Sequence, residues 1–452
     1  MDNTAHDLLN YTMTLAESDL GADVLHQAKR RIIDTIGCAI GAHAAPPVKI
    51  ARKIAPKVHE GKTARVWGCQ SRTSLDMAAF INGVMVRYID FNDTYRTVDG
   101  AHPSDNLPAV LAVAEAEDAS GMDFLLALTI AYEIQCRFVD CIALNSRGWD
   151  MPVSGAIASA LACGRLLGLT EQQLSEALSI SAISNICTYQ SRAGELSMWK
   201  GCAAANGARQ GVFAAMLANE GMTGPSSPFD GEYGLWPQTM GGPQVLKGLA
   251  RKGQKYGVCQ SNIKRFPVKD SLQVPAAAAV DLHGKIPPGQ IAQVRVETYQ
   301  SAYKGAAVDK EFWAPKTRET ADHSMPFCIA VGILDGAITP DTFNRDRHLD
   351  DDIKELLGKC KVEVAESFTK QAPAIRNCRV TISAQDGREV NVHRKLTYDD
   401  IERGLEDSEL EAKFNDLTAE FLPPERQKQL LNAMWDLEKF GSMREFVDLL
   451  KV

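Results

Sequence analysis

Residues 379–392 read Arg-Val-Thr-Ile-Ser-Ala-Gln-Asp-Gly-Arg-Glu-Val-Asn-Val, and this stretch decides the fold class. Polar and apolar residues alternate over 379–382 and again over 389–392, and Asp386-Gly387 lies between the two runs. Alternation with a period of two is typical of a strand with one buried face, and Asp-Gly is typical of the tight turn of a hairpin. The stretch therefore predicts two antiparallel strands.

Two further runs with the same alternation lie upstream, at 293–298 and 361–364. Apolar residues at 323–337 and 350–358 predict helices between these strands. Strands and helices mixed in this way favour helices packed on an antiparallel sheet. We therefore expect residues 265–397 to form an α+β domain.

The rest of the chain predicts helices. Within 25–43, isoleucines recur three to four residues apart, a spacing typical of one helical face. Similar patterns predict helices at 73–88, 104–118, 122–138, 153–167 and 195–219, and we expect no strand before about residue 265. Helices return at 398–452. The fold class is therefore mainly α, with residues 1–264 and 398–452 forming one large discontinuous helical domain that carries 265–397 as a smaller lid domain.

Composition and charge exclude several classes of protein. The chain has 452 residues and a net charge of −8, without a run of basic residues, which argues against a nucleic-acid-binding protein. No apolar stretch reaches about 18 residues and no apolar leader follows Met1, which predicts a cytoplasmic protein without membrane contact. The 11 cysteines include no Cys-x-x-Cys pair, so we expect reduced thiols rather than a metal cluster.

The densest polar segment runs from Arg87 to Arg96 and is followed by His-Pro-Ser-Asp-Asn at 102–106. It lies between two predicted apolar helices, where the free N–H groups at a helix start favour a bound carboxylate. His102 can act as a general base or acid there, because its reference pKa lies nearest neutrality. Asp90 or Asp93 can orient it or titrate. Alternatively, the segment is a capped loop whose acids satisfy backbone donors.

Ionisable residues also occur beside apolar segments at three other positions, where a charge needs a partner. Lys200 lies on the small, apolar face of the predicted helix 195–219, where a cation needs an acid or an anionic ligand, unless it reaches solvent from the helix end. His323 follows a run of ionisable residues before an apolar helix, which a capping loop with surface ion pairs would also explain. Lys264 lies at the predicted domain junction and adds positive charge to a cleft there.

Together these motifs resemble the MmgE/PrpD family, which includes 2-methylcitrate dehydratases, cis-aconitate decarboxylases and an iminodisuccinate epimerase. The resemblance rests on Asp-Phe-Asn-Asp-Thr at 90–94 and His-Pro-Ser-Asp-Asn at 102–106, supported in order by 33–37, 197–201, 221–225 and 317–324. It implies a homodimer, a site in the cleft between the helical domain and the lid, and no metal or other cofactor. The positions that it implies for the site are Asp90, Thr94, His102, Lys200 and Lys264.

The function that this resemblance implies is a cofactor-independent hydro-lyase. We expect it to dehydrate a small tricarboxylate such as 2-methylcitrate or citrate, as in propionate metabolism, by removing a proton beside a carboxylate. The negative charge that builds up needs nearby cations. His102, Asp90 and Lys200 are the expected catalytic residues, with His102 or Asp90 transferring the proton. The expected substrate-binding residues are Thr94, Asp93, Lys264, His323 and Arg87.

One position departs from the pattern that the resemblance implies. Many family members carry a histidine near 148–150, where this chain has Met151, and methionine neither gives nor takes a proton. Decarboxylation is therefore less expected here than dehydration. Two alternatives stay open: an epimerase or isomerase of a dicarboxylate that uses the same proton abstraction, and a catalytically silent carboxylate-binding homologue. Exchange of solvent deuterium into substrate separates the enzymes from the binding protein.

Overall fold

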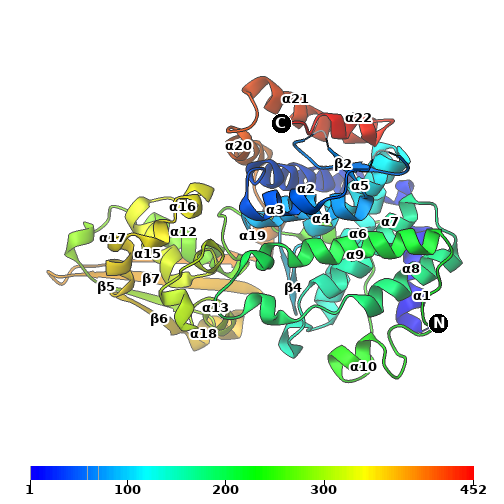
Figure 1. Ribbon diagram of the computed structural model, residues 1–452. Helices are drawn as coiled ribbons and strands as arrows, with labels where there is room; N and C mark the ends of the chain where they lie inside the picture. The colour runs from blue at the N-terminus through cyan, green and yellow to red at the C-terminus, as the bar shows by residue number, and fades with distance from the viewer. Residues whose placement is uncertain (1, 59, 70) are drawn as a thin grey trace.

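The computed structural model describes residues 2–58, 60–69 and 71–452. In Figure 1 the helices of the first half gather on one side and the long strands lie on the other. The helices before residue 265 are α1 (Asn3–Thr14), α2 (Ala22–Gly41), α3 (Pro46–Ile54), α4 (Leu75–Tyr88), α5 (Leu107–Glu117), α6 (Gly121–Cys141), α7 (Pro152–Leu166), α8 (Glu171–Ser184), α9 (Ala203–Asn219), α10 (Leu235–Met240) and α11 (Gly257–Gln260). No helix in the described ranges is both long and apolar enough to cross a bilayer.

Small residues let α7 and α9 approach each other closely at the centre of the helical part. A Cβ atom on Gly211 of α9 would lie 2.5 Å from the carbonyl oxygen of Ala156 on α7, so only glycine fits there. Both helices bury most of their length among the alanines that the sequence places on them. This close contact holds α7 in place, and Met151 at its start borders the site described below.

The C-terminal helices pack back on the helical part. These are α19 (Tyr398–Arg403), α20 (Asp407–Thr418), α21 (Pro424–Trp435) and α22 (Met443–Asp448), and in Figure 1 the last three lie above α2 and α5. Lys413 of α20 pairs with Asp34 of α2 at 2.6 Å. Apolar side chains from 405–450 join the same buried cluster as those of α1, α2 and α6, which supports the proposed assignment of 398–452 to the helical domain.

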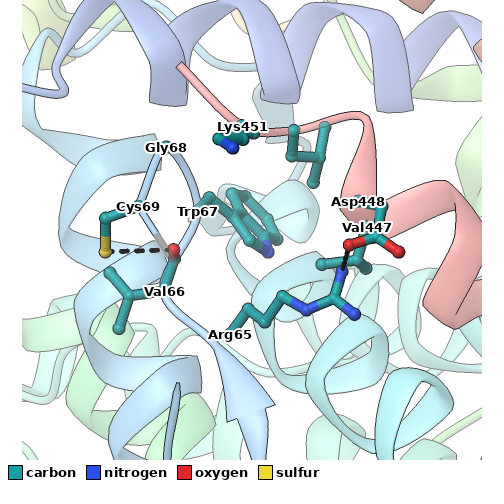
Figure 2. A pocket seen from close by; sticks show the side chains of 9 residues that line it. Arg65, Val66, Trp67, Gly68, Cys69, Val447, Asp448 and Lys451 are labelled. Atoms are coloured by element: carbon teal, nitrogen blue, oxygen red, sulfur yellow. Dashed lines mark hydrogen bonds and ion pairs between the residues drawn. The ribbon is translucent and has the colours of Figure 1, made fainter. Parts of the chain in front are cut away.

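The extreme C-terminus lies against the loop 65–69. Figure 2 shows the hollow of about 200 Å³ between them, with Arg65 paired to Asp448. The backbone N–H of Gly68 donates to the carbonyl of Leu450 at 2.9 Å. The hollow is therefore a seam between two packed segments of the chain.

The long strands form one sheet in the order β6-β5-β7-β8. They are β5 (Ile291–Thr298), β6 (Cys360–Val364), β7 (Ile375–Ala384) and β8 (Glu389–Thr397). β7 and β8 form the hairpin that the opening stretch predicts, with Ile382 opposite Val390. The mainly α fold with an α+β part is confirmed. The sheet is not antiparallel throughout, however, because β6 runs parallel to β5. The helical connection between β5 and β6 makes this possible, since parallel neighbours need a long crossover.

Helices cover one face of this sheet. α12 (Gln273–Asp281) contacts β7 and β8, and α15 packs on α12. Their buried side chains join those of the sheet in a second apolar cluster. The helices of this part, besides α12, are α13 (Gln300–Ala306), α14 (Arg318–Ala321), α15 (Met325–Asp335), α16 (Pro340–Asn344), α17 (Asp351–Leu357) and α18 (Glu366–Gln371).

Two expectations about the first half were wrong. Short antiparallel pairs occur before residue 265, namely β1 (Ala64–Arg65) with β2 (Arg72–Thr73), and β3 (Tyr95–Arg96) with β4 (Gly100–Ala101). Strands of two residues are too short to show an alternating pattern.

The predicted helix 195–219 begins only at Ala203. Leu196 donates its N–H to Thr320 Oγ1 at 3.0 Å and accepts a hydrogen bond from Thr317 Oγ1 at 2.9 Å. In a helix the carbonyl of Leu196 would accept from the N–H of Lys200, but that N–H donates to the carbonyl of Ser197 at 3.0 Å instead. Lys200 consequently lies in the 3₁₀ turn Met198–Gly201 and not on the predicted helical face.

Candidate active site

A polar cavity with about 470 Å³ of empty space lies where the polar segment 87–102 meets the start of α7 and the segment that links the two parts of the chain. Its cationic lining residues are Arg87, Arg96, Arg192 and Lys269, and its acidic ones are Asp90, Asp150 and Asp270. The remaining lining residues are Thr94, Gly100, Ala101, His102, Asn145, Met151, Tyr189 and His323. The sequence analysis thus predicted several of the groups that the fold brings together here.

Asp90 is the centre of the charged network beside the cavity. It follows α4 directly and adopts a positive φ of 49°, which turns its side chain back toward Arg87. Its carboxylate lies 2.8 Å from Arg87 Nη1, 3.0 Å from Lys200 Nζ and 2.6 Å from Lys264 Nζ. Burial alone would raise the pKa of Asp90, but Arg87, Lys200 and Lys264 hold it well below 3.8. Asp90 is therefore an ionised anchor for three cations.

Lys200 joins the two parts of the chain. Its Nζ atom donates to both carboxylate oxygens of Asp322, at 2.7 and 2.8 Å, as well as contacting Asp90. Burial would raise the pKa of Asp322, but Lys200 and His323 lower it. Lys264 is equally buried and donates to Asp90. The amino groups of Lys200 and Lys264 are thus committed to carboxylates behind the cavity lining.

Asp90, Asp322 and His323 lie close enough together to be considered as metal ligands. The ammonium group of Lys200, however, already lies within hydrogen-bond distance of both carboxylates. A divalent cation placed among them would face a buried positive charge at close range, which is strongly repulsive in a low-dielectric interior. These residues therefore fit an internal ion-pair network better than a metal centre.

His102 has a defined tautomer. Its Nδ1 atom lies 2.6 Å from the carbonyl oxygen of Asp93, which can only accept, so Nδ1 carries the proton. Nε2 then carries a lone pair and accepts a hydrogen bond from Arg87 Nη2 at 3.2 Å. Burial, Arg87 and Lys264 lower the pKa of His102 well below 6.5. His102 is therefore a neutral imidazole with a basic nitrogen at the cavity.

His323 repeats this arrangement from the other part of the chain. Its Nδ1 atom donates to Asp322 Oδ1 at 2.6 Å, which leaves the lone pair on Nε2. Burial and Lys200 lower its pKa to about 3. The Ser324 side chain caps α15 just beyond it, so His323 lies immediately before the helix start. His323 is thus a second neutral acceptor on the cavity wall.

Thr94 and Asp93 occupy different places. Thr94 belongs to the cavity lining, its backbone pairs with that of Asn262, and its hydroxyl donates to the carbonyl of Ala101 at 3.4 Å. Asp93 is completely buried behind His102, where Oδ1 accepts a hydrogen bond from the Ser104 N–H at 3.1 Å. Asp93 therefore positions the His102 loop, the structural role that the sequence analysis kept as an alternative for the acids of this segment.

The sequence analysis missed two cations of the lining, Arg192 and Lys269. Arg192 belongs to the 3₁₀ turn Tyr189–Arg192, and its Nε atom lies 3.0 Å from Asp150 Oδ2. Lys269 lies in the linking segment and its Nζ atom donates to the carbonyl of Gly305 at 2.6 Å. Partial burial, with repulsion from Arg96 and Arg192, lowers the pKa of Lys269 to about 7. Neither stands in a periodic pattern, although Lys269 follows soon after Lys264, which was selected.

Comparison with known proteins identifies the family of this chain. The MmgE/PrpD N-terminal domain matches residues 6–246, and the MmgE/PrpD C-terminal domain matches residues 266–439. The chain belongs to the MmgE/PrpD family. The family that the motifs suggested is therefore confirmed, and its matched regions contain every residue of the cavity lining.

Curated relatives match along nearly the whole chain. The 2-methylcitrate dehydratase of Cupriavidus necator is 29% identical over 99% of this chain and 97% of its own length. The cis-aconitate decarboxylase of Homo sapiens is 28% identical over 95% of this chain and 90% of its own length. The 2-methylcitrate dehydratase of Escherichia coli (strain K12) is 27% identical over 99% and 97%. The relatives named here are thus two dehydratases and one decarboxylase.

Proposed function

We propose that this MmgE/PrpD protein is a cofactor-independent hydro-lyase that dehydrates a small tricarboxylate such as 2-methylcitrate or citrate. The observation that carries the proposal is His102, a neutral imidazole whose unprotonated Nε2 atom lies at a cavity lined by arginines and a lysine. Such a cavity attracts a polycarboxylate, and it holds a base beside the bound acid.

The cationic side chains of the lining bring positive charge close to a bound substrate. Asp90, Asp150 and Asp270 are each paired with cations, so they do not neutralise the whole lining. The Thr94 hydroxyl and the His323 Nε2 atom offer neutral hydrogen-bonding groups that can orient a substrate hydroxyl. In this proposal Lys200 and Lys264 act through Asp90, which they hold ionised, and Asp90 in turn orients Arg87.

His102 is the proposed base. Once Arg87 Nη2 turns from His102 to a substrate carboxylate, the freed Nε2 lone pair takes the proton from the carbon beside that carboxylate, and Arg87 stabilises the negative charge that develops there. In the free protein the pKa of His102 is well below 6.5, because burial and the nearby charges of Arg87 and Lys264 oppose protonation of the imidazole. A bound polycarboxylate supplies negative charge nearby and raises the basicity of this nitrogen.

Lys269 is the proposed acid. Its pKa of about 7 lets the ammonium form donate a proton near neutrality, and it faces the cavity that also contains His102 and Met151. As the carbon–oxygen bond breaks, the Lys269 proton goes to the departing hydroxide and forms water. The electron pair of the broken carbon–hydrogen bond becomes the new double bond, so the step balances without a metal or a redox cofactor.

The wider setting belongs to the same proposal. We place the enzyme in the cytoplasm, where its free cysteines stay reduced, and in propionate metabolism if 2-methylcitrate is the substrate. A homodimer is supported by large apolar side chains exposed on the α8–α9 region, namely Ile183, Ile186, Met198, Trp199 and Phe213.

The test is an ultraviolet assay of purified protein, with a chelator present, against citrate and the stereoisomers of 2-methylcitrate. A hydro-lyase creates a conjugated alkene and absorbance rises. A flat trace, followed by deuterium incorporation into a dicarboxylate observed by NMR, would replace the proposal with an epimerase. Carbon dioxide release from cis-aconitate would replace it with a decarboxylase, and silence in all three assays would indicate a binding protein.

A further inference from the structure

Arg192 leaves one end of its guanidinium group without a partner. Its side chain is only 8% exposed. Nε donates to Asp150 Oδ2 at 3.0 Å and Nη1 donates to the carbonyl oxygen of Lys200 at 2.9 Å. Nη2 is buried and, within the described residues, has no hydrogen-bond partner. The group is thus fixed on two sides and free on the third.

A fixed, buried guanidinium nitrogen without a partner is costly, because it has lost its hydrogen bonds to water and gained none from the protein. Arg192 lines the cavity, so a ligand can supply the missing acceptor. Arg87 also lines the cavity and has an unpartnered nitrogen, but that Nε atom lies 3.6 Å from the Asp105 carboxylate. Arg318 stacks on the Tyr88 ring, 4.2 Å from its centroid, and does not belong to the cavity lining.

The surroundings of Arg192 select the charge of such a ligand. Lys269 and Arg96 line the same cavity as Arg192. Both arginines repel a positive charge on Lys269. Asp150 is already occupied, because it accepts hydrogen bonds from Arg192 and from the Ser191 hydroxyl. The position therefore favours an anion, and a carboxylate suits the planar guanidinium best.

We propose that Arg192 is a specificity-determining residue that binds one carboxylate of the substrate through Nη2, and that Asp150 is the positioning residue that holds it there. The inference rests on the proposed function in one respect, the polycarboxylate nature of the substrate. Arg192 makes the cavity prefer three carboxylates over two, because the additional carboxylate satisfies the buried donor.

The test measures binding of acids that cannot react. Tricarballylate carries three carboxylates and no hydroxyl, and glutarate has the same carbon chain without the central carboxylate. Isothermal titration calorimetry gives the ratio of their affinities for the wild type, Arg192→Gln and Arg192→Lys. We expect Arg192→Gln to lower this ratio roughly tenfold or more, the usual effect of losing a charged hydrogen bond. Arg192→Lys keeps the charge without the fork and gives an intermediate ratio.

Arg209→Gln is the matched control. Arg209 also donates from Nε to an aspartate, Asp76, at 3.0 Å, but it lies outside the cavity, so its substitution leaves the ratio unchanged. Thermal unfolding and retained glutarate binding establish that the Arg192 variants are folded.

An unchanged ratio in folded Arg192→Gln, or a wild type that does not prefer tricarballylate, overturns the assignment. Either result is independent of dehydration, because neither acid has a hydroxyl to lose. Failure of the proposed hydro-lyase, by contrast, appears only in the assays of turnover.

Discussion

The Nζ atom of Lys200 lies 2.7 Å from Oδ1 of Asp322, 122 positions later in the chain. Both side chains are almost completely buried, and the contact joins the turn before α9 to the residue after α14. Asp90 accepts from the same Nζ atom at 3.0 Å. The cavity wall is therefore tied to the packing of the sheet-containing part against the helical part.

Lys200→Met should be strongly destabilising. It leaves Asp90 and Asp322 buried beside each other with less compensating charge, and removing one partner of a buried ion pair costs about 3–5 kcal/mol. Urea unfolding measures the loss. Lys255→Met is the control, because Lys255 pairs with Glu402 at 2.8 Å on the surface and its removal should leave the unfolding midpoint in place. Equal behaviour of the two variants would show that the Lys200 pairs contribute no stability.

Gly121→Ala tests the packing of the C-terminal helices. Gly121 begins α6 and donates its N–H to the carbonyl of Phe440 at 2.8 Å, and an added Cβ would lie 1.8 Å from the carbonyl oxygen of Leu437. Because backbone must move to relieve this overlap, we expect a loss of about 3 kcal/mol in the free energy of unfolding. Gly242→Ala, where no atom lies within 4 Å of the added carbon, is the control. A stable Gly121→Ala would contradict the contact.

Local patterns predicted the parts of the fold that local physics determines. The hairpin of β7 and β8 follows from two alternating runs around Asp386-Gly387, and α2 follows from apolar residues on one face. The partner of β6 could not be predicted in this way. Which strand lies beside β6 depends on the long connection from β5. The alternating pattern at 361–364 does not indicate whether the strand runs parallel or antiparallel to its neighbour.

The same distinction separates the predicted site residues from the missed ones. Asp90 and His102 belong to one polar segment between two helices, so proximity in sequence revealed them. Arg192 and Lys269 reach the cavity from a 3₁₀ turn and a linking segment, and only the assembled fold brings them to it. Lys200 was selected for a helical face that does not exist, because residues 198–201 form a 3₁₀ turn and α9 begins only at Ala203.

His323→Gln should reduce the loss of stability in acid. The folded protein keeps His323 neutral down to a pKa of about 3, while the unfolded chain takes up this proton below about pH 6.5. Stability is therefore lost as pH falls through this window, by up to about 1.4 kcal/mol per pH unit for one proton. Without the imidazole, the folded and unfolded states no longer differ in the binding of this proton, so this part of the acid destabilisation disappears.

The pH dependence of the free energy of unfolding must be compared between the wild type and the variant, because other groups titrate in the same pH range. Burial raises the pKa of Asp105 to about 7, and this proton has the opposite effect on stability as pH falls. Urea unfolding of the wild type and His323→Gln between pH 6 and 4 isolates the histidine. Parallel curves would mean that the folded and unfolded states bind the His323 proton equally.

His102→Gln should strongly reduce turnover and spare the fold. Glutamine keeps a polar group near Arg87 and the Asp93 carbonyl but cannot accept a proton from carbon. We expect a fall in kcat of roughly 10²–10⁴-fold, the usual contribution of general base catalysis, with tricarballylate affinity largely retained. Solvent deuterium exchange into substrate should fall in parallel. Near-normal turnover in the variant would remove His102 from the base role.

Lys269→Arg separates binding from proton donation at the other side of the cavity. Arginine stays charged at every pH of interest, so the variant should keep its affinity for tricarballylate within about threefold. It cannot give up a proton near neutrality, so kcat should fall by roughly 10²–10⁴-fold. In the wild type, kcat/KM should decline above about pH 7, because the ammonium form of Lys269 is then lost.

Lys304→Arg is the matched control for this experiment, since Lys304 is exposed on α13 next to Gly305, whose carbonyl accepts from Lys269. Its rate and pH profile should equal those of the wild type. If Lys269→Arg instead retained the wild-type kcat, Lys269 would serve only as a cation for the substrate. The proton for the leaving hydroxide would then have to come from another group on the lining. Tyr189, which also lines the cavity, would be the next to substitute, because burial raises its pKa and keeps its hydroxyl protonated.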